Sequence, residues 1–334
     1  MIQRLTPFAG AVRALFAPYR RDTLTPPRPV AAGGRGMARR VVPVVLAAVA
    51  LAAAGYGAYA FLRHTPTPHE VAPPVFTASD DPPPPAATFA ELAESDPVGM
   101  YEACLSRYAR EAKGFRATVE KHERTRGELR PREVVRIEVR DQPPAALLRW
   151  QEGGQRGVTA SLYAPEVTGP QIKAWRPAAA LATLRDWSID AKGDSARQAS
   201  RYCVKDAGLY PSMLRTYTAW KKRKEAGDLR TEYLGKQVVG PAGGRECHVV
   251  RRYCPRTEID PFALDEEAPT DPKVIARDGF TEVTVMIDAE RWLQVGSVLK
   301  NASGALVGEY YFRDVELVTE FPPDTFTLAN LRKK

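Results

Sequence analysis

Residues 132–151 read REVVRIEVRDQPPAALLRWQ, and this stretch decides the fold class. Between Arg132 and Arg140, apolar residues alternate with charged ones, so the segment has one apolar and one charged face. That period is typical of an antiparallel strand with one buried side. A turn at Asp141–Pro144 follows, and Ala145–Gln151 alternates again. The stretch therefore predicts two neighbouring strands of an antiparallel sheet.

The same alternation recurs through the rest of the C-terminal part. Helical spacing of apolar residues interrupts it at Thr88–Lys113, Ser195–Val204 and Leu209–Ala226. One large sheet that curls around these helices buries all the apolar faces economically. We expect an α+β fold, a large curved antiparallel half-barrel wrapped around helices. Its other strands are expected at Phe115–Leu129, Val158–Tyr163, Gln171–Trp175, Trp187–Asp190, Arg230–Val238, Arg245–Tyr253, Phe280–Asp288, Arg291–Asn301 and Leu306–Val318.

An apolar segment precedes the predicted sheet. Val41–Leu62 holds 22 residues without a charge, and at about 1.5 Å per residue a helix of that length crosses a bilayer core. Residues 1–40 carry eight Arg and one acid, whereas residues 64–100 carry six acids and no Lys or Arg. Because positive flanks stay in the cytoplasm, we expect a single-pass inner (cytoplasmic) membrane protein with a periplasmic C-terminal domain. The alternative is a signal peptide that starts at Met37 and is cleaved after Ala58-Tyr59-Ala60.

Four segments follow from this interpretation. Residues 1–40, rich in Arg, Pro, Ala and Gly, are expected to form a disordered cytoplasmic tail, and residues 41–62 the single transmembrane helix. Residues 63–87 are a proline-rich linker, because eight Pro between Thr65 and Ala87 favour an extended spacer. Residues 88–334 form the exported domain, which is long enough for one hydrophobic core.

The charge of the exported domain is only mildly positive. Beyond residue 100, 39 Lys and Arg face 33 acids. We expect no nucleic-acid partner, since an exported domain rarely meets one, and instead a lipid, an acylated protein or a negatively charged surface. The densest cationic run is Lys221-Lys222-Arg223-Lys224, which ends a predicted helix. The helix dipole is a sufficient structural reason for it, and contact with anionic headgroups is the alternative.

All four cysteines lie in the exported part, and an even number in an oxidising compartment suggests disulfides. Cys247 and Cys254 are seven positions apart on one predicted strand, so they would lie roughly 23 Å apart on opposite faces, too far for a bond. Each is therefore expected to pair with Cys104 or Cys203, or to stay free. Metal ligation is the alternative, but no CxxC spacing or pair of histidines supports it, and we expect no metal.

No motif specifies a reaction. The chain has four His and lacks the G-x-S-x-G, H-E-x-x-H, P-loop and G-x-G-x-x-G patterns. We therefore expect no catalytic residues and no cofactor, although carboxylate pairs in a cleft remain the alternative. The apolar strand faces are the candidate ligand surface, and packing against the enclosed helices is the alternative for them. The candidate ligand-binding residues are Val135, Ile137, Val139, Leu148, Trp150, Val283, Val285, Ile287, Tyr310 and Phe312.

Phe115–Trp150, FRATVEKHERTRGELRPREVVRIEVRDQPPAALLRW, resembles the bacterial exported family named domain of unknown function 1571. The resemblance covers most of residues 98–328 and implies the half-open antiparallel barrel of outer-membrane lipoprotein carriers (LolA/LolB-like). It says little about activity, because the function of that family is undefined. The matching pieces are Glu123-Arg124, Gly127-Glu128-Leu129, Pro131, Val139-Arg140, Pro143, Trp150, Gly304, Gly308, Tyr310, Phe312, Asp314 and Asp324-Thr325-Phe326.

The leading prediction is a membrane-anchored envelope protein whose exported domain binds a lipid, an acyl chain or another amphiphile without catalysis. The second hypothesis is a structural or protein-interaction module with no small ligand, in which helices fill the sheet. The two hypotheses differ in one observable: whether the concave face of the half-barrel is hollow or filled by the chain's own side chains.

Overall fold

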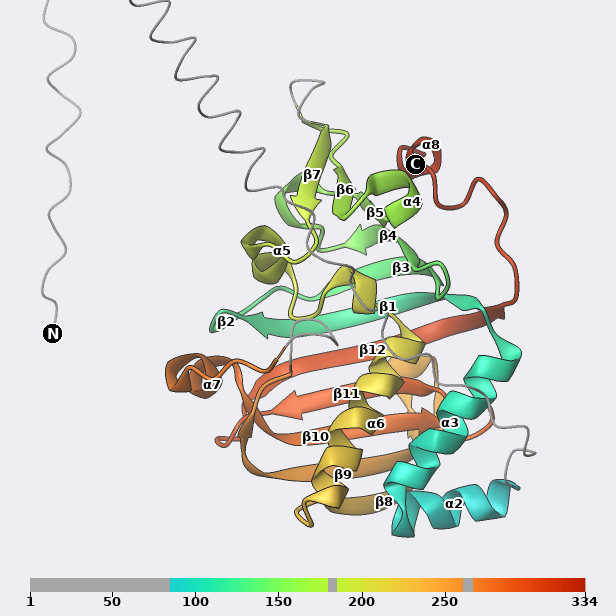
Figure 1. Cartoon of the computed structure of the whole chain (residues 1–334), viewed down its shortest axis with the longest axis vertical. Helices are drawn as coiled ribbons and strands as arrows, with labels where there is room; N and C mark the ends of the chain where they lie inside the picture. The colour runs from blue at the N-terminus through green and yellow to red at the C-terminus, as the bar shows by residue number, and fades with distance from the viewer. Residues whose placement is uncertain (1–84, 180–184, 261–266, 334) are drawn as a thin grey trace, which may run out of the picture. The chain divides into compact units, whose positions relative to one another are not determined.

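The computed structural model describes residues 85–179, 185–260 and 267–333, and these form an α+β fold built on one antiparallel sheet of 12 strands (Figure 1). The predicted fold class is confirmed for these residues. The strands are β1 (Gly114–Thr125), β2 (Glu128–Leu129), β3 (Glu133–Arg140), β4 (Ala145–Glu152), β5 (Ala160–Tyr163), β6 (Gln171–Trp175), β7 (Asp186–Asp190), β8 (Arg230–Val239), β9 (Arg245–Glu258), β10 (Phe280–Asp288), β11 (Gln294–Lys300) and β12 (Leu306–Val318).

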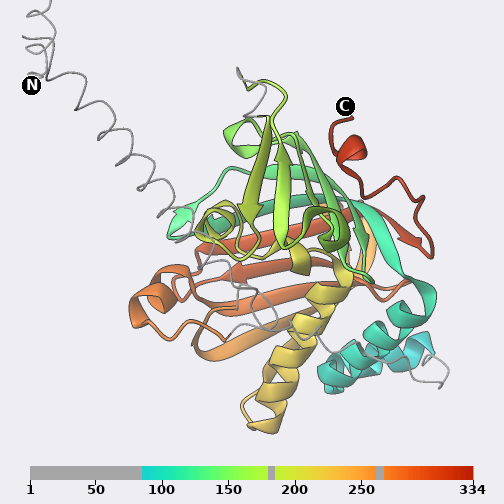
Figure 2. The same ribbon diagram turned by 45° about the horizontal axis from the view of Figure 1, so that its top comes forward.

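The sheet is curved and not closed. Its order is β7-β6-β5-β4-β3-β1-β12-β11-β10-β9-β8, with β2 paired to β1 off this path. Within β3–β7 and within β8–β12, strands consecutive in the chain are neighbours, and β7 and β8 form the two edges. At the centre β1 pairs with both β3 and β12, and the β1–β12 pair brings the two ends of the domain together. Figure 2 shows β5, β6 and β7 curling forward from the rest of the sheet. The concave face therefore has two halves, one on each side of the β1–β12 pair.

Seven α-helices and three 3₁₀ turns accompany the sheet in the described residues. α6 crosses the β9–β12 half of the concave face, with α3 beside it (Figure 1). The elements are α2 (Ala86–Ser95), α3 (Pro97–Glu111), α4 (Pro165–Thr168), α5 (Asp194–Ala199), α6 (Leu209–Glu225), α7 (Pro272–Asp278) and α8 (Leu328–Leu331), and the turns η1 (Gln155–Gly157), η3 (Val204–Asp206) and η4 (Gly240–Ala242).

The helix predicted over Thr88–Lys113 is two helices, α2 and α3, which meet at Asp96. The backbone of Asp96 is not helical, with φ −140° and ψ 73°, and its side chain accepts a hydrogen bond from the Gly99 amide at 3.1 Å. Pro97 follows at the first position of α3. The residue before a proline is driven out of the helical region, and aspartate is a favoured N-cap, so the Asp-Pro pair ends one helix and begins the next.

The main core lies between α2, α3, α6 and the concave face of the sheet. Its largest fully buried side chains include Tyr101 on α3, Phe115 on β1 and Trp220 on α6. Tyr101 and Trp220 meet edge to face with ring centroids 5.2 Å apart, a favoured arrangement of aromatic rings. The helices thus occupy one half of the concave face with their own side chains.

None of the four cysteines forms a disulfide, so the predicted pairing of Cys247 and Cys254 with Cys104 or Cys203 is wrong and the alternative of unbonded thiols holds. Cys104 and Cys247 belong to the main core, whereas Cys203 packs beside Tyr163 and Cys254 beside Phe280 in separate clusters. Each cysteine therefore packs among different apolar neighbours, as a small hydrophobic side chain. Burial raises the pKa of the Cys247 and Cys254 thiols to about 12, which keeps them protonated and unreactive.

The predicted membrane segment Val41–Leu62, the predicted tail, residues 1–40, and residues 63–84 of the predicted linker lie outside the described residues. The end of the linker, predicted at residue 87, is wrong by two residues, because α2 already begins at Ala86. Among the residues that the structure describes, no helix has the length and apolar character needed to span a bilayer.

Candidate functional site

A cavity of about 500 Å³, called the hollow here, lies on the concave face of the sheet. Side chains of β1, β3 and β4–β7 line one side of it. The other side is lined by α5, by residues 200–208 and by α6, with contributions from β9–β12. The hollow is therefore the part of the half-barrel that α3 and α6 leave unfilled.

Seven of the ten predicted ligand-binding residues line the hollow: Val135, Ile137, Leu148, Trp150, Val283, Tyr310 and Phe312. The other three, Val139, Val285 and Ile287, are 5 %, 0 % and 0 % exposed and belong to the main core. The strand pattern placed all ten on apolar faces, but it could not show which part of the surface the helices would cover. A ligand-binding role of the seven stays a prediction.

The apolar wall of the hollow is built from two rows of side chains that run across the strands. One row joins Phe312, Val119, Val135 and Trp150 across β12, β1, β3 and β4. Directly opposed residues of neighbouring strands share a face, so each row forms a continuous surface. The second row, across β4–β7, is Leu148, Ser161, Ala174 and Trp187.

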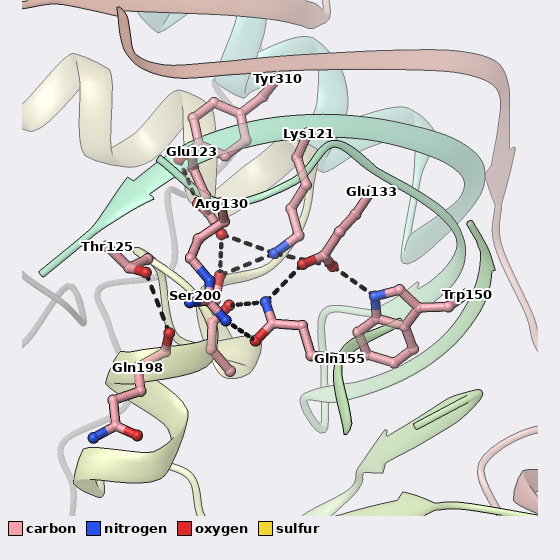
Figure 3. Close-up of polar contacts among 11 residues, drawn as sticks. Lys121, Glu123, Thr125, Arg130, Glu133, Trp150, Gln155, Gln198, Ser200 and Tyr310 are labelled. Carbon is pink, nitrogen blue, oxygen red and sulfur yellow. Dashed lines mark hydrogen bonds and ion pairs between the residues drawn. The ribbon is translucent and has the colours of Figure 1, made fainter. Parts of the chain in front are cut away.

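One pleat further along the strands, the surface becomes polar. Tyr310, Lys121 and Glu133 oppose one another across β12, β1 and β3. The Nζ atom of Lys121 lies 2.8 Å from Oε1 of Glu123 and 3.5 Å from Oε2 of Glu133 (Figure 3). The side chains of Glu123 and Glu133 are only 3 % and 5 % exposed. Lys121, Glu123, Glu133 and their hydrogen-bond partners are called the polar end of the hollow.

Neutral side chains donate further hydrogen bonds to the two carboxylates. Glu133 accepts the indole N–H of Trp150 at 2.6 Å and the amide of Gln155 at 2.9 Å (Figure 3). Glu123 accepts the hydroxyls of Tyr310 at 2.6 Å and of Ser200 at 3.0 Å. Because Trp150 and Tyr310 also line the hollow, the polar end fixes the orientation of two rings in its wall.

The two charges of the central ion pair stabilise each other. Burial by itself raises the pKa of Glu123, but the charge of Lys121 and the hydrogen bonds from Lys121, Tyr310 and Ser200 outweigh burial, so the net shift is downward. Burial lowers the pKa of Lys121, and the charges of Glu123 and Glu133 outweigh it, so the net shift is upward. Lys121 and Glu123 are therefore both ionised at neutral pH.

A glycine makes room for one of the rings at the polar end. Gly308 on β12 pairs with Glu123 on β1, and a Cβ atom at Gly308 would come within 3.0 Å of the Tyr310 ring. The ring therefore lies against the bare backbone of Gly308, which brings its hydroxyl to the Glu123 carboxylate. A Cβ atom at this position would press on the Tyr310 ring, which would have to shift by a few tenths of an ångström.

The predictions from sequence missed the polar end. Lys121 and Glu123 have the same parity along β1 as Val119, and Glu133 has the same parity along β3 as Val135. Alternation alone would have placed these charges on the concave face. The ligand surface predicted from sequence consists of the apolar strand residues alone and therefore omits these charged ones.

The cationic run at the end of α6 is largely paired within the domain. Arg223 lies 2.8 Å from Glu258 and 3.2 Å from Asp228. Lys224 lies 2.8 Å from Asp96, and Lys221 donates to the Tyr217 hydroxyl at 3.1 Å. The contacts of Arg223 and Lys224 join α6 to its neighbours, and that of Lys221 lies within α6, so all three have a structural role. Contact of Lys221, Lys222, Arg223 and Lys224 with a headgroup stays a prediction.

No metal-binding group of three His, Cys, Asp or Glu side chains occurs in the described ranges. In the polar end, the ionised groups already bind one another, and the hollow beside them is mostly apolar. Such an arrangement suits holding and orienting an amphiphilic molecule, with hydrocarbon along the wall and a polar group near the charges.

The profile of the family DUF1571, described as "Protein of unknown function", matches residues 112–332, which is more than half of the chain. The chain belongs to this family. The resemblance found in Phe115–Trp150 is thereby confirmed. No curated protein matches the sequence of this DUF1571 chain.

Three solved structures are similar to the DUF1571 chain, each at 13 % identity. A structure of MucB has a TM-score of 0.36, with 69 % of this chain and 62 % of that chain covered, so this chain spans less than two thirds of MucB. A putative outer membrane lipoprotein-sorting protein domain from Vibrio parahaemolyticus has a TM-score of 0.28, covering 74 % and 97 %. The Mycobacterium tuberculosis lipoprotein LppX has a TM-score of 0.34, covering 65 % and 93 %. At such scores nothing about function follows.

Proposed function

We propose that this DUF1571 protein is a membrane-anchored envelope protein whose exported domain binds a lipid, an acyl chain or another amphiphile without catalysis. The hollow is the observation that carries the proposal: its volume of about 500 Å³ lies within the usual range of ligand sites, roughly 300–1,000 Å³. Hydrocarbon that packs along the wall of the hollow is removed from water. This removal contributes about 25 cal/mol of binding free energy per Å² of apolar surface.

Membrane anchoring and export are part of the proposal and are supported by the sequence. Val41–Leu62 is long enough to span a bilayer, and the arginines of residues 1–40 favour an N-terminus in the cytoplasm. A reporter enzyme that is active only outside the cytoplasm tests this orientation. We expect activity when the reporter is fused to the C-terminus and none when it is fused to the N-terminus. The reverse result would contradict the proposed orientation.

The second candidate function is a structural or protein-interaction module without a small ligand. It is favoured by the half of the concave face that α3 and α6 fill, where Val139, Val285 and Ile287 are buried in the core. In that case the hollow would stay without a lipid in the cell, and its volume would be a packing defect between the helices and β3–β7.

The two candidates are distinguished by filling the hollow without touching the rest of the domain. Ala219 and Thr218 are neighbours on α6, but Ala219 lines the hollow whereas Thr218 is exposed. Ala219→Trp therefore places an indole in the hollow, and Thr218→Trp places the same indole in solvent. Full-length protein and both variants are purified in one non-ionic detergent, and the retained lipid is extracted and counted by mass spectrometry.

If the hollow binds an amphiphile, wild type and Thr218→Trp retain a similar amount of lipid, and Ala219→Trp retains less. Lipid bound at the membrane segment is common to all three proteins, so the difference reports on the hollow alone. Equal retention by Ala219→Trp and wild type would favour the module without a ligand. Thermal unfolding of the three proteins checks that each is folded.

A further inference from the structure

A second, smaller cavity of about 170 Å³ adjoins the hollow, and arginines dominate its lining. The two cavities share Thr125, Arg126, Ser200 and Asp260 in their linings. Its volume exceeds that of several water molecules, at about 30 Å³ each. We call it the arginine recess. It is lined by Arg124, Arg126, Arg197, Arg201 and Arg277 against three carboxylates, Asp260, Glu267 and Asp278.

The recess is built around the turn that follows β1. Asp278, at the end of α7, accepts the Gly127 amide at 2.6 Å and pairs with Arg277 at 2.6 Å. Arg124 donates to the Gly127 carbonyl at 2.7 Å, and Arg201 donates to the Asp278 carbonyl at 2.8 Å. Backbone carbonyls therefore position the two guanidinium groups, and they do not neutralise them.

Several guanidinium donors of the recess lack an acceptor. Nε of Arg124 and both Nε and Nη2 of Arg201 are buried and have no acceptor at full hydrogen-bond geometry among the described residues, although the Tyr202 hydroxyl lies close to the Arg201 guanidinium. Burial lowers the pKa of Arg201, and the nearby Tyr202 and Tyr310 hydroxyls and the Asp260 charge outweigh it, so Asp260 compensates the guanidinium in part without a close ion pair in the described ranges. Leaving a buried donor unmet costs free energy, more so for a charged group. An anion held in the recess would offset part of that cost through its charge, and a phosphate matches the planar fork of arginine.

We propose that the arginine recess binds the phosphate group of a phospholipid whose hydrocarbon part occupies the adjacent hollow. This inference rests on the proposed function and narrows its ligand to anionic, phosphate-bearing lipids. Arg126 belongs to both cavities and is exposed, and in the described part of the chain it pairs with the exposed Asp194 at 2.9 Å. It therefore marks the point at which a headgroup would pass from one cavity to the other.

The test compares two lipids with the same chains, phosphatidic acid and diacylglycerol, which differ only in the phosphate. Full-length protein in a non-ionic detergent is incubated with each lipid, and the lipid retained after washing is counted. We expect phosphatidic acid to bind about tenfold more tightly, because hydrogen bonds to charged groups are the stronger ones. Arg124→Gln with Arg201→Gln should abolish this preference and leave diacylglycerol binding unchanged.

Two further variants separate a binding effect from a folding effect. Arg136→Gln with Arg256→Gln removes two exposed arginines outside both cavities, and it should keep the preference. Arg126→Gln removes an exposed side chain, so it should fold normally and reduce the preference in part. If the Arg124 and Arg201 double variant does not fold, the result with Arg126→Gln decides.

Each outcome supports or overturns a defined part of the proposal. Equal binding of the two lipids by wild type, or a preference that survives in both recess variants, overturns the phosphate site and leaves the proposed function standing. Retention of neither lipid contradicts the proposed function itself. Inorganic phosphate is a further probe. If it binds at the recess and the protein still prefers phosphatidic acid to diacylglycerol, the result supports a site for the lipid headgroup. If inorganic phosphate binds but the protein shows no preference between the two lipids, the recess is a site for the free ion, and the proposal of a phospholipid site is overturned.

Discussion

Lys121 holds the polar end together, since it is the cation between two buried carboxylates, Glu123 and Glu133. Taking a charge out of water is costly, and the cost is recovered only while its partner is present. The two rings that Glu123 and Glu133 orient, Tyr310 and Trp150, depend on the same pairing. A change at Lys121 is therefore expected to affect both the stability of the domain and the shape of the hollow.

Lys121→Met should destabilise the domain strongly, by about 3–5 kcal/mol, because it leaves two buried carboxylates without a cation. Asp194→Asn is the matched control. It breaks the ion pair with Arg126, whose side chains are 43 % and 85 % exposed, and should change the free energy of unfolding by less than about 1 kcal/mol. Urea denaturation of the two variants measures both values, and equal small losses would contradict the role of Lys121.

Glu123 should make the stability of the domain depend on pH in the acidic range. Its pKa in the folded domain lies below the ordinary value of 4.5, so the unfolded chain binds the proton more readily than the folded one. The contribution of Glu123 is then fully present above about pH 4.5 and is lost as the pH falls through the lowered folded pKa.

Glu123→Gln should remove this contribution. Its unfolding free energy is expected to lie below that of wild type at pH 7, and the difference should shrink as the pH falls below about 4.5. Urea titrations from pH 3 to pH 7 give the two profiles. Glu94→Gln, at an exposed position of α2, should reproduce the wild-type profile. A constant difference between Glu123→Gln and wild type at every pH would rule out this account.

At the scale of the elements, α6 is set against the sheet by the glycine that precedes it. Gly208 has φ +124°, and a Cβ atom there would lie 2.7 Å from the Phe115 ring. Gly227, just after α6, also has a positive φ, +73°, but a Cβ atom there would have no neighbour within 4 Å. A side chain is disfavoured by the positive φ at both ends of the helix, and at Gly208 it would also meet the sheet.

Gly208→Ala should cost more stability than Gly227→Ala. In both variants the unfavourable φ lowers the free energy of unfolding by about 1–3 kcal/mol. Only Gly208→Ala also forces the helix away from Phe115, which lowers it by about 1–3 kcal/mol more. Thermal denaturation of the two variants gives the difference. If the two losses are the same, Gly208 does not determine how closely α6 approaches β1.

Most strands were predictable because each carries its own alternation, as Arg132–Arg140 and Phe280–Asp288 do. The break at Asp96 was also encoded locally, in an Asp-Pro pair that the periodicity of Thr88–Lys113 concealed. The cysteines were not predictable in this way. Whether Cys104 or Cys203 meets another thiol depends on where α3 and residues 200–204 dock, and docking is set by packing of the whole domain.

The site was predictable in part for the same reason. Each apolar face can be assigned from one strand, so seven residues of the wall follow from alternation. The boundary between core and hollow depends on how the helices lie over the sheet, since Ile287 belongs to the core beneath them and Leu148 lines the hollow. The sequence of α6 shows an apolar face, but it does not show over which strands that face lies.

At the scale of the whole molecule, a ligand in the hollow should stabilise the domain, because the unfolded chain has no hollow to bind it. A ligand present at about 100 times its Kd adds about 2.7 kcal/mol, which corresponds to a rise in Tm of several degrees for a domain of this size. Thermal unfolding with and without added lipid measures the shift. Ala219→Trp should show no shift, and a shift equal to that of wild type would place the lipid elsewhere.

The sheet ends in two rims, β7 and β8, and neither has a second partner strand among the described residues. A closed barrel has its diameter fixed by strand number and stagger, whereas this sheet carries no such constraint. Its two rims can part or approach by bending every ladder slightly, with no hydrogen bond between strands broken. The hollow can thus adjust to ligands of different width. Selectivity for the length of a ligand's hydrocarbon chain is therefore expected to be weak.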